Sequence, residues 1–293
     1  MAGRGAGNRG VARAVGGLSW SALIFTTMAL DLKSKKTQVL LRLLEMCQEK
    51  NDFRFHNDQV KDVARQAGFG NPFDVTKLDN LSLLPQALLD LDLAVIHLGK
   101  GFHAFVKGTR HVYHTFEAIA NQIDWPYRKS LLNNYNSSES NTLSVANNPR
   151  ILHDFVFGQD TEFDTGPIEL RPKTYFPHRT KKSLYYEVGE YKVGDLLQIE
   201  VDLTIEFQGT VAVFEGKNGK PDTFNIFQLY RPFLYYHLAN ESDIGLQGRI
   251  KEIIGVYVIR QANTLKLWAY SFDNPFDPTS IRFLRAKAYR LIP

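Results

Sequence analysis

The side chains of this chain that are best suited to chemistry are two carboxylates and one lysine between residues 196 and 220. Asp202 lies upstream of Glu215, and Lys217 follows Glu215 after one intervening residue. Paired carboxylates are hard oxygen ligands of the kind that Mg²⁺ takes, and this ion completes its shell with water and phosphate oxygens. A lysine beside such a site can orient an attacking water or stabilise charge on a phosphoryl group. These residue types therefore indicate phosphodiester hydrolysis with Mg²⁺ as the cofactor.

Two strands must bring these side chains together. Apolar and polar residues alternate strictly from residue 199 to 206, which predicts one strand with Asp202 on its polar face. Gln208-Gly209 predicts the turn after it, and the next strand carries Glu215 and Lys217 on a common face near its carboxyl end. An antiparallel pair of these strands places the three side chains close together. The alternative is a surface hairpin whose polar face carries ordinary solvated charges.

The segment after this hairpin predicts a helix and then more strands. DTFNIFQLYRPFLYYHL is amphipathic and begins just after Pro221, so Gln228 is expected near the strand end that carries Lys217, and Pro232 is expected to kink the helix. The strands expected to complete a mixed sheet lie at residues 250–260, 264–272 and 280–292. Ligands collect at strand ends in open sheets of this kind.

Taken together, these residues resemble the PD-(D/E)XK nuclease superfamily and, within it, the type II restriction endonucleases. Asp202 matches the first acidic position, Glu215-Gly216-Lys217 matches the Glu-x-Lys motif, and Gln228 lies in the following helix. The resemblance covers roughly residues 175–272. It implies that Asp202 and Glu215 hold Mg²⁺, that Lys217 activates or orients the water, and that Gln228 positions the site.

The chain also departs from the pattern of that superfamily. Val201 stands where the family name has Pro, and no single residue fits the upstream helical acidic position, for which Glu187 and Glu190 are the candidates. The resemblance implies a mixed-sheet α/β/α core of the restriction-endonuclease kind. It also implies an endonuclease that cuts double-stranded DNA as a homodimer, since two sites facing opposite strands match a two-fold symmetric target.

A basic segment with aromatic residues precedes this core. RPKTYFPHRTKK suits phosphate contacts and stacking on bases, although a solvated connecting loop is the more frequent fate of such a run. Outside it, Arg231 follows Gln228 by one helical turn, and Lys100 lies in a turn nearer the amino terminus. The residues expected to contact DNA are Lys100, Lys173, His178, Arg179, Lys181, Lys182 and Arg231.

The first third of the chain predicts a small helical unit. Apolar residues recur with helical spacing from Thr37 to Cys47, Asn57 is expected to cap a second helix, and a third helical region runs over residues 72–91, divided near Pro85. Two apolar strands joined at Gly99, Lys100 and Gly101 then predict a hairpin. Three helices followed by a hairpin is the order of a winged helix, a fold that binds DNA in some proteins and other proteins in others.

These predictions give an α+β protein. Residues 1–36 are expected to be a disordered or mis-assigned extension, because their basic start and short apolar run resemble a targeting segment while charged helical sequence begins after Met28. The expected units are a winged-helix-like domain at 37–110, a helical connector at 111–160 and the nuclease core at 161–293.

Composition narrows the remaining possibilities. Cys47 is the single cysteine, which excludes a disulfide or a cysteine-based metal cluster within one chain and favours a reducing, cytoplasmic setting. The 8 histidines are scattered and form no metal-binding spacing. A net charge of +4 permits nucleic-acid binding without requiring it. No apolar stretch after residue 30 approaches the roughly eighteen residues of a membrane span, so no membrane partner is expected.

Two other functions fit parts of the same sequence. One is a DNA-binding transcriptional regulator, with the winged-helix-like domain as its reader and an inert carboxyl-terminal domain. The other is a repair, mobile-element or structure-specific nuclease built on the same core. Incubation with plasmids and divalent ions separates the three, because discrete bands, smears and intact DNA are different outcomes.

Overall fold

The computed structural model describes residues 34–134, 138–158, 167–168 and 171–293 of the chain. The predicted amino-terminal extension therefore lies outside the described residues, except for Ser34 and the first two residues of the helix that follows it. The described part is α+β, as the sequence predicts. None of its helices has the length and apolar character that crossing a membrane requires.

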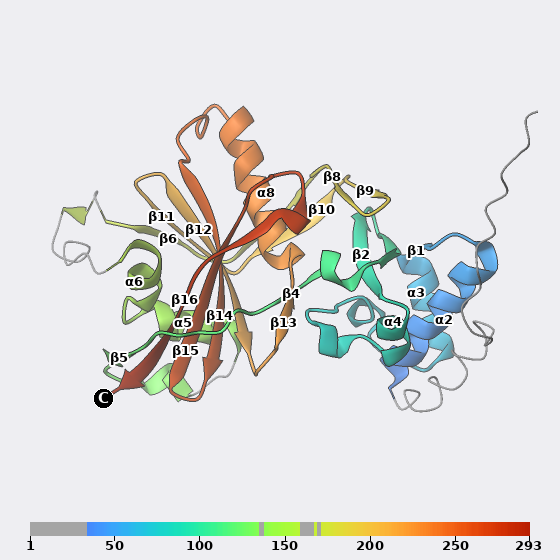
Figure 1. The fold of residues 1–293 in the computed structure, drawn as a ribbon, viewed down its shortest axis with the longest axis horizontal. Coiled ribbons are helices and arrows are strands. Elements are labelled where there is room, and N and C mark those ends of the chain that lie inside the picture. Colours follow the sequence, from blue (N-terminus) through green and yellow to red (C-terminus); the bar gives the residue numbers. More distant parts are fainter. Residues whose placement is uncertain (1–33, 135–137, 159–166, 169–170) are drawn as a thin grey trace, which may run out of the picture.

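A seven-stranded mixed sheet forms the centre of the carboxyl-terminal part (Figure 1). Its strands, in spatial order, are β5 (Gln122–Pro126), β16 (Ile281–Ile292), β15 (Thr264–Phe272), β14 (Glu252–Gln261), β12 (Thr210–Asn218), β11 (Leu203–Phe207) and β6 (Lys173–Tyr175). β12 pairs with β14 in parallel, as does β16 with β5, and the other pairs are antiparallel. The strands expected after residue 250 are confirmed.

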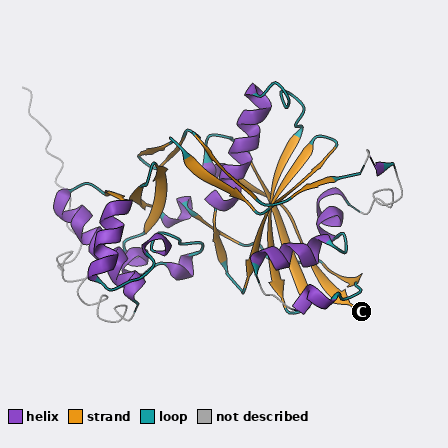
Figure 2. Cartoon of the chain, turned by 180° about the vertical axis from the view of Figure 1, so that it is seen from behind, coloured by secondary structure: helices purple, strands orange, loops and turns teal. Residues whose placement is uncertain are grey.

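Helices cover both faces of this sheet (Figures 1 and 2). They are α8 (Phe227–Ser242), α5 (Glu139–Asn147) and α6 (Ile151–Phe157). Val211 and Val213 of β12 pack in one apolar cluster with α8, whereas Ala212 and Phe214 pack with α5 and α6 in another. This division follows from the alternation of side chains along a strand. α8 connects β12 to β14 and so forms a crossover between parallel strands.

The amino-terminal part combines short helices with a small sheet. Its elements are α2 (Lys35–Lys50), β1 (Arg54–His56), α3 (Asn57–Gln66), α4 (Gln86–Asp90), β2 (Leu93–Gly99) and β3 (Phe102–Lys107). The predicted first helix and the hairpin are confirmed, and the hairpin gains β1 as a third strand. α3 is capped by His56 rather than by Asn57, because the Asn57 amide oxygen lies 2.8 Å from Nε2 of His103.

The third predicted helical region is mostly irregular. Only α4 is α-helical there, and it is preceded by two short 3₁₀ helices at Pro72–Asp74 and Leu81–Leu83. Each of these short helices begins directly after an asparagine, Asn71 or Asn80. The Asn80 side chain accepts a hydrogen bond from the Ser82 amide, and local bonds of this kind compete with a continuous helix. The segment between them is used for docking, as described below.

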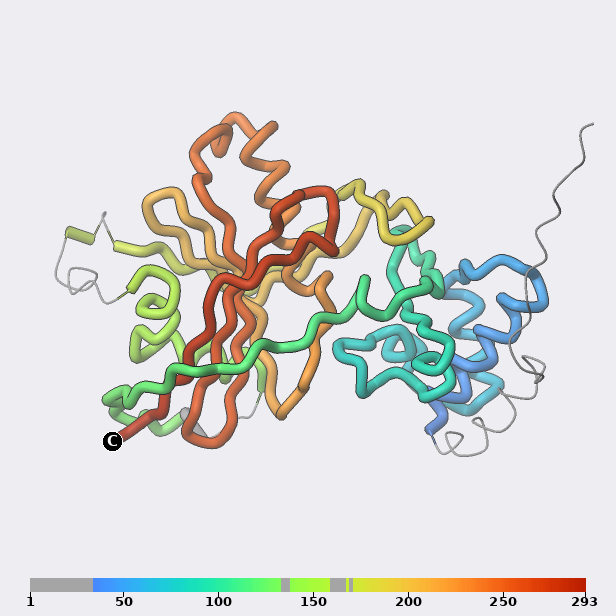
Figure 3. Tube along the Cα trace, in the orientation of Figure 1, coloured from blue at the N-terminus to red at the C-terminus, as the bar shows by residue number. Residues whose placement is uncertain are grey.

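The predicted helical connector is wrong over its first half. Residues 113–126 are extended and contain β4 (Tyr113–Thr115) and β5, so only α5 and α6 remain of the expected helices. β4 pairs with β13 (Thr223–Asn225), and β5 pairs with the edge of the large sheet. Figure 3 shows this green segment running from the amino-terminal part along the large sheet. Pairing with distant strands therefore overrides local helical propensity here.

The predicted strand from residue 199 to 206 is also two strands. β10 (Leu197–Val201) pairs with β7 (His178–Lys182) in a separate ribbon, and β11 belongs to the large sheet. Ile199 and Val201 pack in the cluster that contains α8, whereas Leu203 and Ile205 pack in the opposite cluster. The apolar side chains before Asp202 therefore point into one cluster and those after it into the other, so the side on which they are buried changes between the two strands. A further hairpin, β8 (Tyr186–Val188) and β9 (Tyr191–Val193), precedes β10.

One apolar cluster joins the two parts of the molecule. It extends from α2, α3 and the small sheet to β10, β12 and α8. At the tip of the β2–β3 hairpin, a Cβ on Gly99 would lie 2.1 Å from the carbonyl oxygen of Gly194, so the hairpin contacts the turn before β10 backbone to backbone. The amino-terminal part is therefore packed against the carboxyl-terminal part through a continuous core.

Candidate active site

Three of the predicted site residues meet at the carboxyl end of β12. Nζ of Lys217 lies 3.0 Å from Oε1 of Glu215. Gln228, in the first turn of α8, donates a hydrogen bond from Nε2 to the same Glu215 oxygen at 2.8 Å. The Tyr257 hydroxyl donates to Oε1 of Gln228 at 3.3 Å, which fixes the orientation of the amide. β12, β14 and α8 therefore hold the Glu215 carboxylate between a cation and an amide.

Asp202 joins this group through the backbone of the motif. Its Oδ2 accepts a hydrogen bond from the Gly216 amide at 3.1 Å. The β11–β12 ladder ends at the pair Leu203 and Phe214, so this carboxylate takes the place of a further strand partner. Gly216 must be glycine, because a Cβ there would lie 2.9 Å from Leu143 of α5 and 3.0 Å from a backbone carbonyl of the same helix.

Two further carboxylates, neither of them predicted from the sequence, contact the lysine. Oε1 of Glu139 lies 2.8 Å from Nζ of Lys217, and Oδ2 of Asp79 lies 3.7 Å from it. Glu139 is the first residue of α5, directly after the N-cap Ser138. A serine cap followed by an acid in the first turn is a local signal for such a position, but the strand that it faces is not visible in the sequence.

The two candidates for the upstream acidic position lie elsewhere. Glu187 belongs to the β8–β9 hairpin, where its carboxylate is 3.9 Å from Lys192, and Glu190 lies in the turn of that hairpin. Glu139 is instead the helical acid that contacts Lys217. Glu139, rather than Glu187 or Glu190, contacts Lys217 because α5 rather than the hairpin packs against the end of β12.

Burial shapes the protonation of the cluster. It raises the pKa of Glu215 to about 8, and the negative charges of Asp202 and Glu139 add to this effect while Lys217 opposes it. Burial also raises the pKa of Asp202, against the Gly216 hydrogen bond and Lys217. Burial alone would lower the pKa of Lys217, but the surrounding carboxylates outweigh it and raise that pKa. The cluster therefore has more acidic groups than one ammonium can neutralise.

The excess of acidic groups over the single ammonium raises the question of whether the site can hold a divalent cation. No group of three or more His, Cys, Asp and Glu side chains arranged for a metal ion occurs in the described part of the chain. Mg²⁺ requires less, because it is commonly bound by one or two carboxylates together with water and phosphate oxygens. Asp202 and Glu215 provide such a pair, and a cation beside them would favour their charged forms against the burial that raises both pKa values. The donor set therefore fits Mg²⁺.

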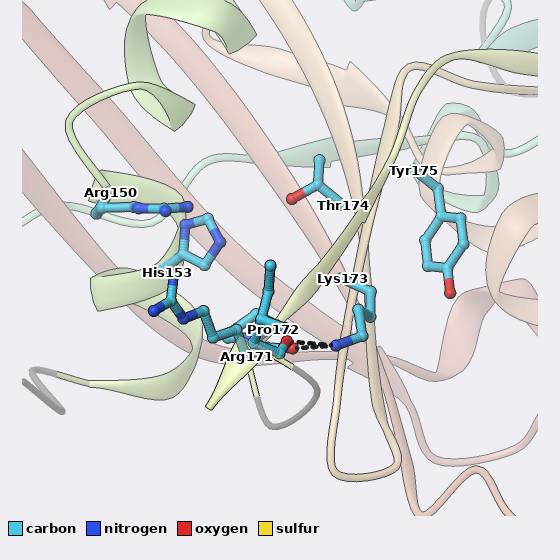
Figure 4. A pocket seen from close by; sticks show the side chains of 8 residues that line it. Arg150, His153, Arg171, Pro172, Lys173, Thr174 and Tyr175 are labelled. Carbon is cyan, nitrogen blue, oxygen red and sulfur yellow. Dashed lines mark hydrogen bonds between the residues drawn. The ribbon is translucent and has the colours of Figure 1, made fainter. Parts of the chain in front are cut away.

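The expected DNA-contacting residues fall into three groups. The first is Lys173, which lines a cavity of about 560 Å³ at the β6 edge of the sheet. Figure 4 shows Arg150 and His153, from the start of α6, on the same side of this cavity as Arg171. Lys173 donates to the carbonyl oxygens of Ile168 and Arg171 at 3.0 and 3.1 Å. This lysine thus helps to hold the segment before β6 in place.

The second group lies on β7 of the β7–β10 ribbon and consists of His178, Arg179, Lys181 and Lys182. His178 pairs with Val201, the residue before Asp202, so one end of the ribbon adjoins the candidate site. Lys181 and Lys182 are exposed toward the other end. Arg179 is exposed as well, and its Nε donates to Glu200 of β10 at 2.8 Å. The ribbon therefore extends an exposed basic surface away from Asp202.

The third group contacts other residues of the protein. Arg231 donates from Nε to the Tyr186 hydroxyl at 3.1 Å and from its other end to the carbonyl of His97 at 3.4 Å. Lys100 forms an ion pair of 2.8 Å with Asp195. In this structure, both cations link the amino-terminal part to the carboxyl-terminal part.

Comparison with known proteins gives two family matches. Residues 36–105 match the family described as Domain of unknown function (DUF6996), and residues 108–290 match Domain of unknown function (DUF6997). No curated protein and no solved structure matches the chain. The second match covers more than half of the chain and includes Glu139, Asp202, Glu215, Lys217 and Gln228. The chain therefore belongs to the DUF6997 family.

Proposed function

We propose that this protein is a Mg²⁺-dependent endonuclease that hydrolyses double-stranded DNA, with a core of the PD-(D/E)XK kind and the activity of a type II restriction enzyme. The observation that carries the proposal is the convergence of Asp202, Glu215 and Lys217 at one strand end. Lys217 is 3.0 Å from Glu215, and Asp202 is bonded to the amide of the residue between them. A mixed sheet with helices on both faces is consistent with such a core.

The side chains divide the work of hydrolysis. Asp202 and Glu215 would hold Mg²⁺, which when bound stabilises charge on the phosphate and lowers the pKa of a water ligand. The Lys217 ammonium orients the attacking water and stabilises the charge that develops on phosphorus-bound oxygen. Gln228 keeps the Glu215 carboxylate in one orientation through its 2.8 Å hydrogen bond. The water oxygen bonds to phosphorus and the water releases one proton to solvent, while one P–O ester bond breaks and the leaving oxygen takes up a proton.

The DNA-binding surface in this proposal is the β7–β10 ribbon with the end of β6 and the turn that joins β6 to β7. Lys181 and Lys182 are exposed and suit phosphate contacts, which require only positive charge near the backbone. Tyr175 and Phe176 are 53% and 82% exposed beside them and suit stacking on bases. The ribbon begins next to Asp202, so DNA bound along it passes the cluster. A homodimer would present two such sites to the two strands.

The amino-terminal part is proposed as a winged-helix-like unit, and its charges argue against a dominant DNA-reading role. On α3, Lys61 pairs with Asp58 at 3.1 Å, and Arg65 pairs with Asp62. The outward face of this helix therefore carries balanced charge rather than a basic stripe. This weakens the rival reading as a DNA-binding regulator, which needs that unit to bind DNA alone.

Incubation of the full chain with several supercoiled plasmids, with Mg²⁺ or with EDTA, tests the proposal. Discrete Mg²⁺-dependent bands are expected for a restriction enzyme. Smears would assign the site to a repair or mobile-element nuclease with the same core. Intact plasmids together with Mg²⁺-independent binding in a gel-shift assay would favour the regulator and end the nuclease proposal.

A further inference from the structure

We propose that the amino-terminal part completes the candidate active site, with Asp79 as a positioning residue that holds the Lys217 ammonium in place. Asp79 lies in the segment that matches DUF6996, whereas Lys217 lies in the DUF6997 match. The two matched segments would then form one site rather than a reader and an independent nuclease. This inference rests on the proposed nuclease function.

The geometry around Lys217 brings together distant parts of the chain. Its Nζ lies 3.7 Å from Asp79, 2.8 Å from Glu139 and 3.0 Å from Glu215. Glu139 and Glu215 lie within hydrogen-bond distance of the ammonium, whereas Asp79 at 3.7 Å acts on it through charge, which leaves the third N–H donor for a water. The lysine side chain is 14% exposed, which leaves little solvent to replace a lost partner.

The backbone around Asp79 is fixed by contacts that do not involve the ion pair. The Asn225 amide donates to the carbonyl oxygen of Asp79 at 2.8 Å, and the Asn225 side chain donates to the Leu78 carbonyl at 3.3 Å. Leu81 donates to the Thr223 hydroxyl at 2.9 Å. Residues on both sides of Asp79 are therefore bound to β13, and the docked segment sets where its carboxylate lies.

The same docking contact leads directly to the other side of the cluster. Asn225 ends β13 and accepts a hydrogen bond from the amide of Phe227 at 3.0 Å, where α8 begins. The next residue, Gln228, bonds to Glu215. The segment that carries Asp79 thus also supports the start of the helix that orients the Glu215 carboxylate.

Loss of the Asp79 charge should affect the chemical step rather than DNA binding. With two carboxylates left, Nζ of Lys217 is drawn toward Glu139 and Glu215 and away from its position in the native cluster. Misplacement of a catalytic group by about 1 Å can cost roughly a hundredfold in rate. The exposed basic ribbon, which supplies the proposed DNA contacts, is unchanged by this substitution.

The test compares full-length Asp79→Asn, Asp79→Glu and Asp74→Asn. Asp74 is a matched control, because it belongs to the same part of the chain, forms an ion pair of 3.2 Å with Lys36, and is 42% exposed against 44% for Asp79. D79N is expected to lower kcat for plasmid cleavage by about tenfold to a hundredfold with KM for DNA nearly unchanged. D79E should restore part of kcat, and D74N should match the wild type. A wild-type kcat in D79N, or a change confined to KM, would overturn the inference.

A second measurement does not depend on cleavage. Thermal unfolding of D79N, K217M and the double variant forms a cycle, and the inference requires the Tm changes to be non-additive, because each single change breaks the same ion pair. Additive changes would overturn the inference even if the wild type cleaves DNA. If the wild type cleaves no DNA, the nuclease proposal and the catalytic role of Asp79 both fall, and the cycle then decides only whether this carboxylate contacts Lys217.

Discussion

Replacing Glu215 with Gln removes a buried carboxyl group and should change how stability depends on pH. Burial raises the pKa of this group from 4.5 to about 8 in the folded chain, so the folded state holds the proton more tightly than the unfolded state. The stabilisation from this proton is complete below pH 4.5 and is lost as pH rises through about 8. The metal-free wild type should therefore become less stable across this window. E215Q, which keeps an oxygen acceptor for Gln228, should not.

The size of the effect follows from the pKa change. At about 1.4 kcal/mol for each pH unit, a change from 4.5 to about 8 corresponds to about 5 kcal/mol as an upper value. Interaction with Lys217 is already included, but relaxation of the site reduces the measured value to about 2–5 kcal/mol. For a chain of this size, such a loss lowers Tm by roughly 3–8 °C.

The assay is Tm against pH in EDTA for the wild type, E215Q and the control E187Q. Glu187 is 70% exposed in the β8–β9 hairpin, so its variant should follow the wild-type curve. Addition of Mg²⁺ should stabilise the wild type increasingly at higher pH, because the ion competes with the proton, and should have little effect on E215Q. Parallel curves for the wild type and E215Q would refute the reasoning about this carboxyl group.

Two further predictions concern the surfaces around the site. The double variant K181A/K182A should weaken binding to all DNA sequences and reduce the slope of log Kd against log salt concentration by about 2. Its kcat at saturating DNA should be unchanged. An unaltered salt slope in a titration would argue against the ribbon as the DNA-binding surface. G99A should lower Tm well beyond the G70A control. A Cβ on Gly99 would lie 2.1 Å from the Gly194 carbonyl oxygen, whereas a Cβ on Gly70 meets no atom within 4 Å. Equal Tm values for the two variants would show that the hairpin does not dock as described.

The sequence predicts the regular parts of this molecule well. Apolar runs locate β12, β14 and β15, which are buried on both faces at the centre of the sheet, and helical spacing locates α2, which buries one face. Glu215, Lys217 and Gln228 can be grouped in advance for the same reason. All three lie on elements that are adjacent in the chain and packed together.

What the sequence hides is set by contacts between distant segments. The reversal at Asp202 arises because β10 pairs with β7 outside the large sheet, and alternation continues through the break without a sign of it. Glu139 and Asp79 reach Lys217 only after α5 and the docked segment pack against the end of β12. Nothing in their local sequence marks that neighbour. Arg231 likewise has the spacing of a DNA contact but bonds to Tyr186.

The rate of plasmid cleavage by Lys217→Ala, beside the control Lys192→Ala, tests the central claim most directly. Lys192 is 88% exposed and remote from the end of β12 in the chain, so K192A should cleave like the wild type. K217A should lose at least about a hundredfold in Mg²⁺-dependent cleavage while still binding DNA in a gel-shift assay. Cleavage by K217A at the wild-type rate, or wild-type cleavage that is as fast in EDTA as in Mg²⁺, would contradict the account.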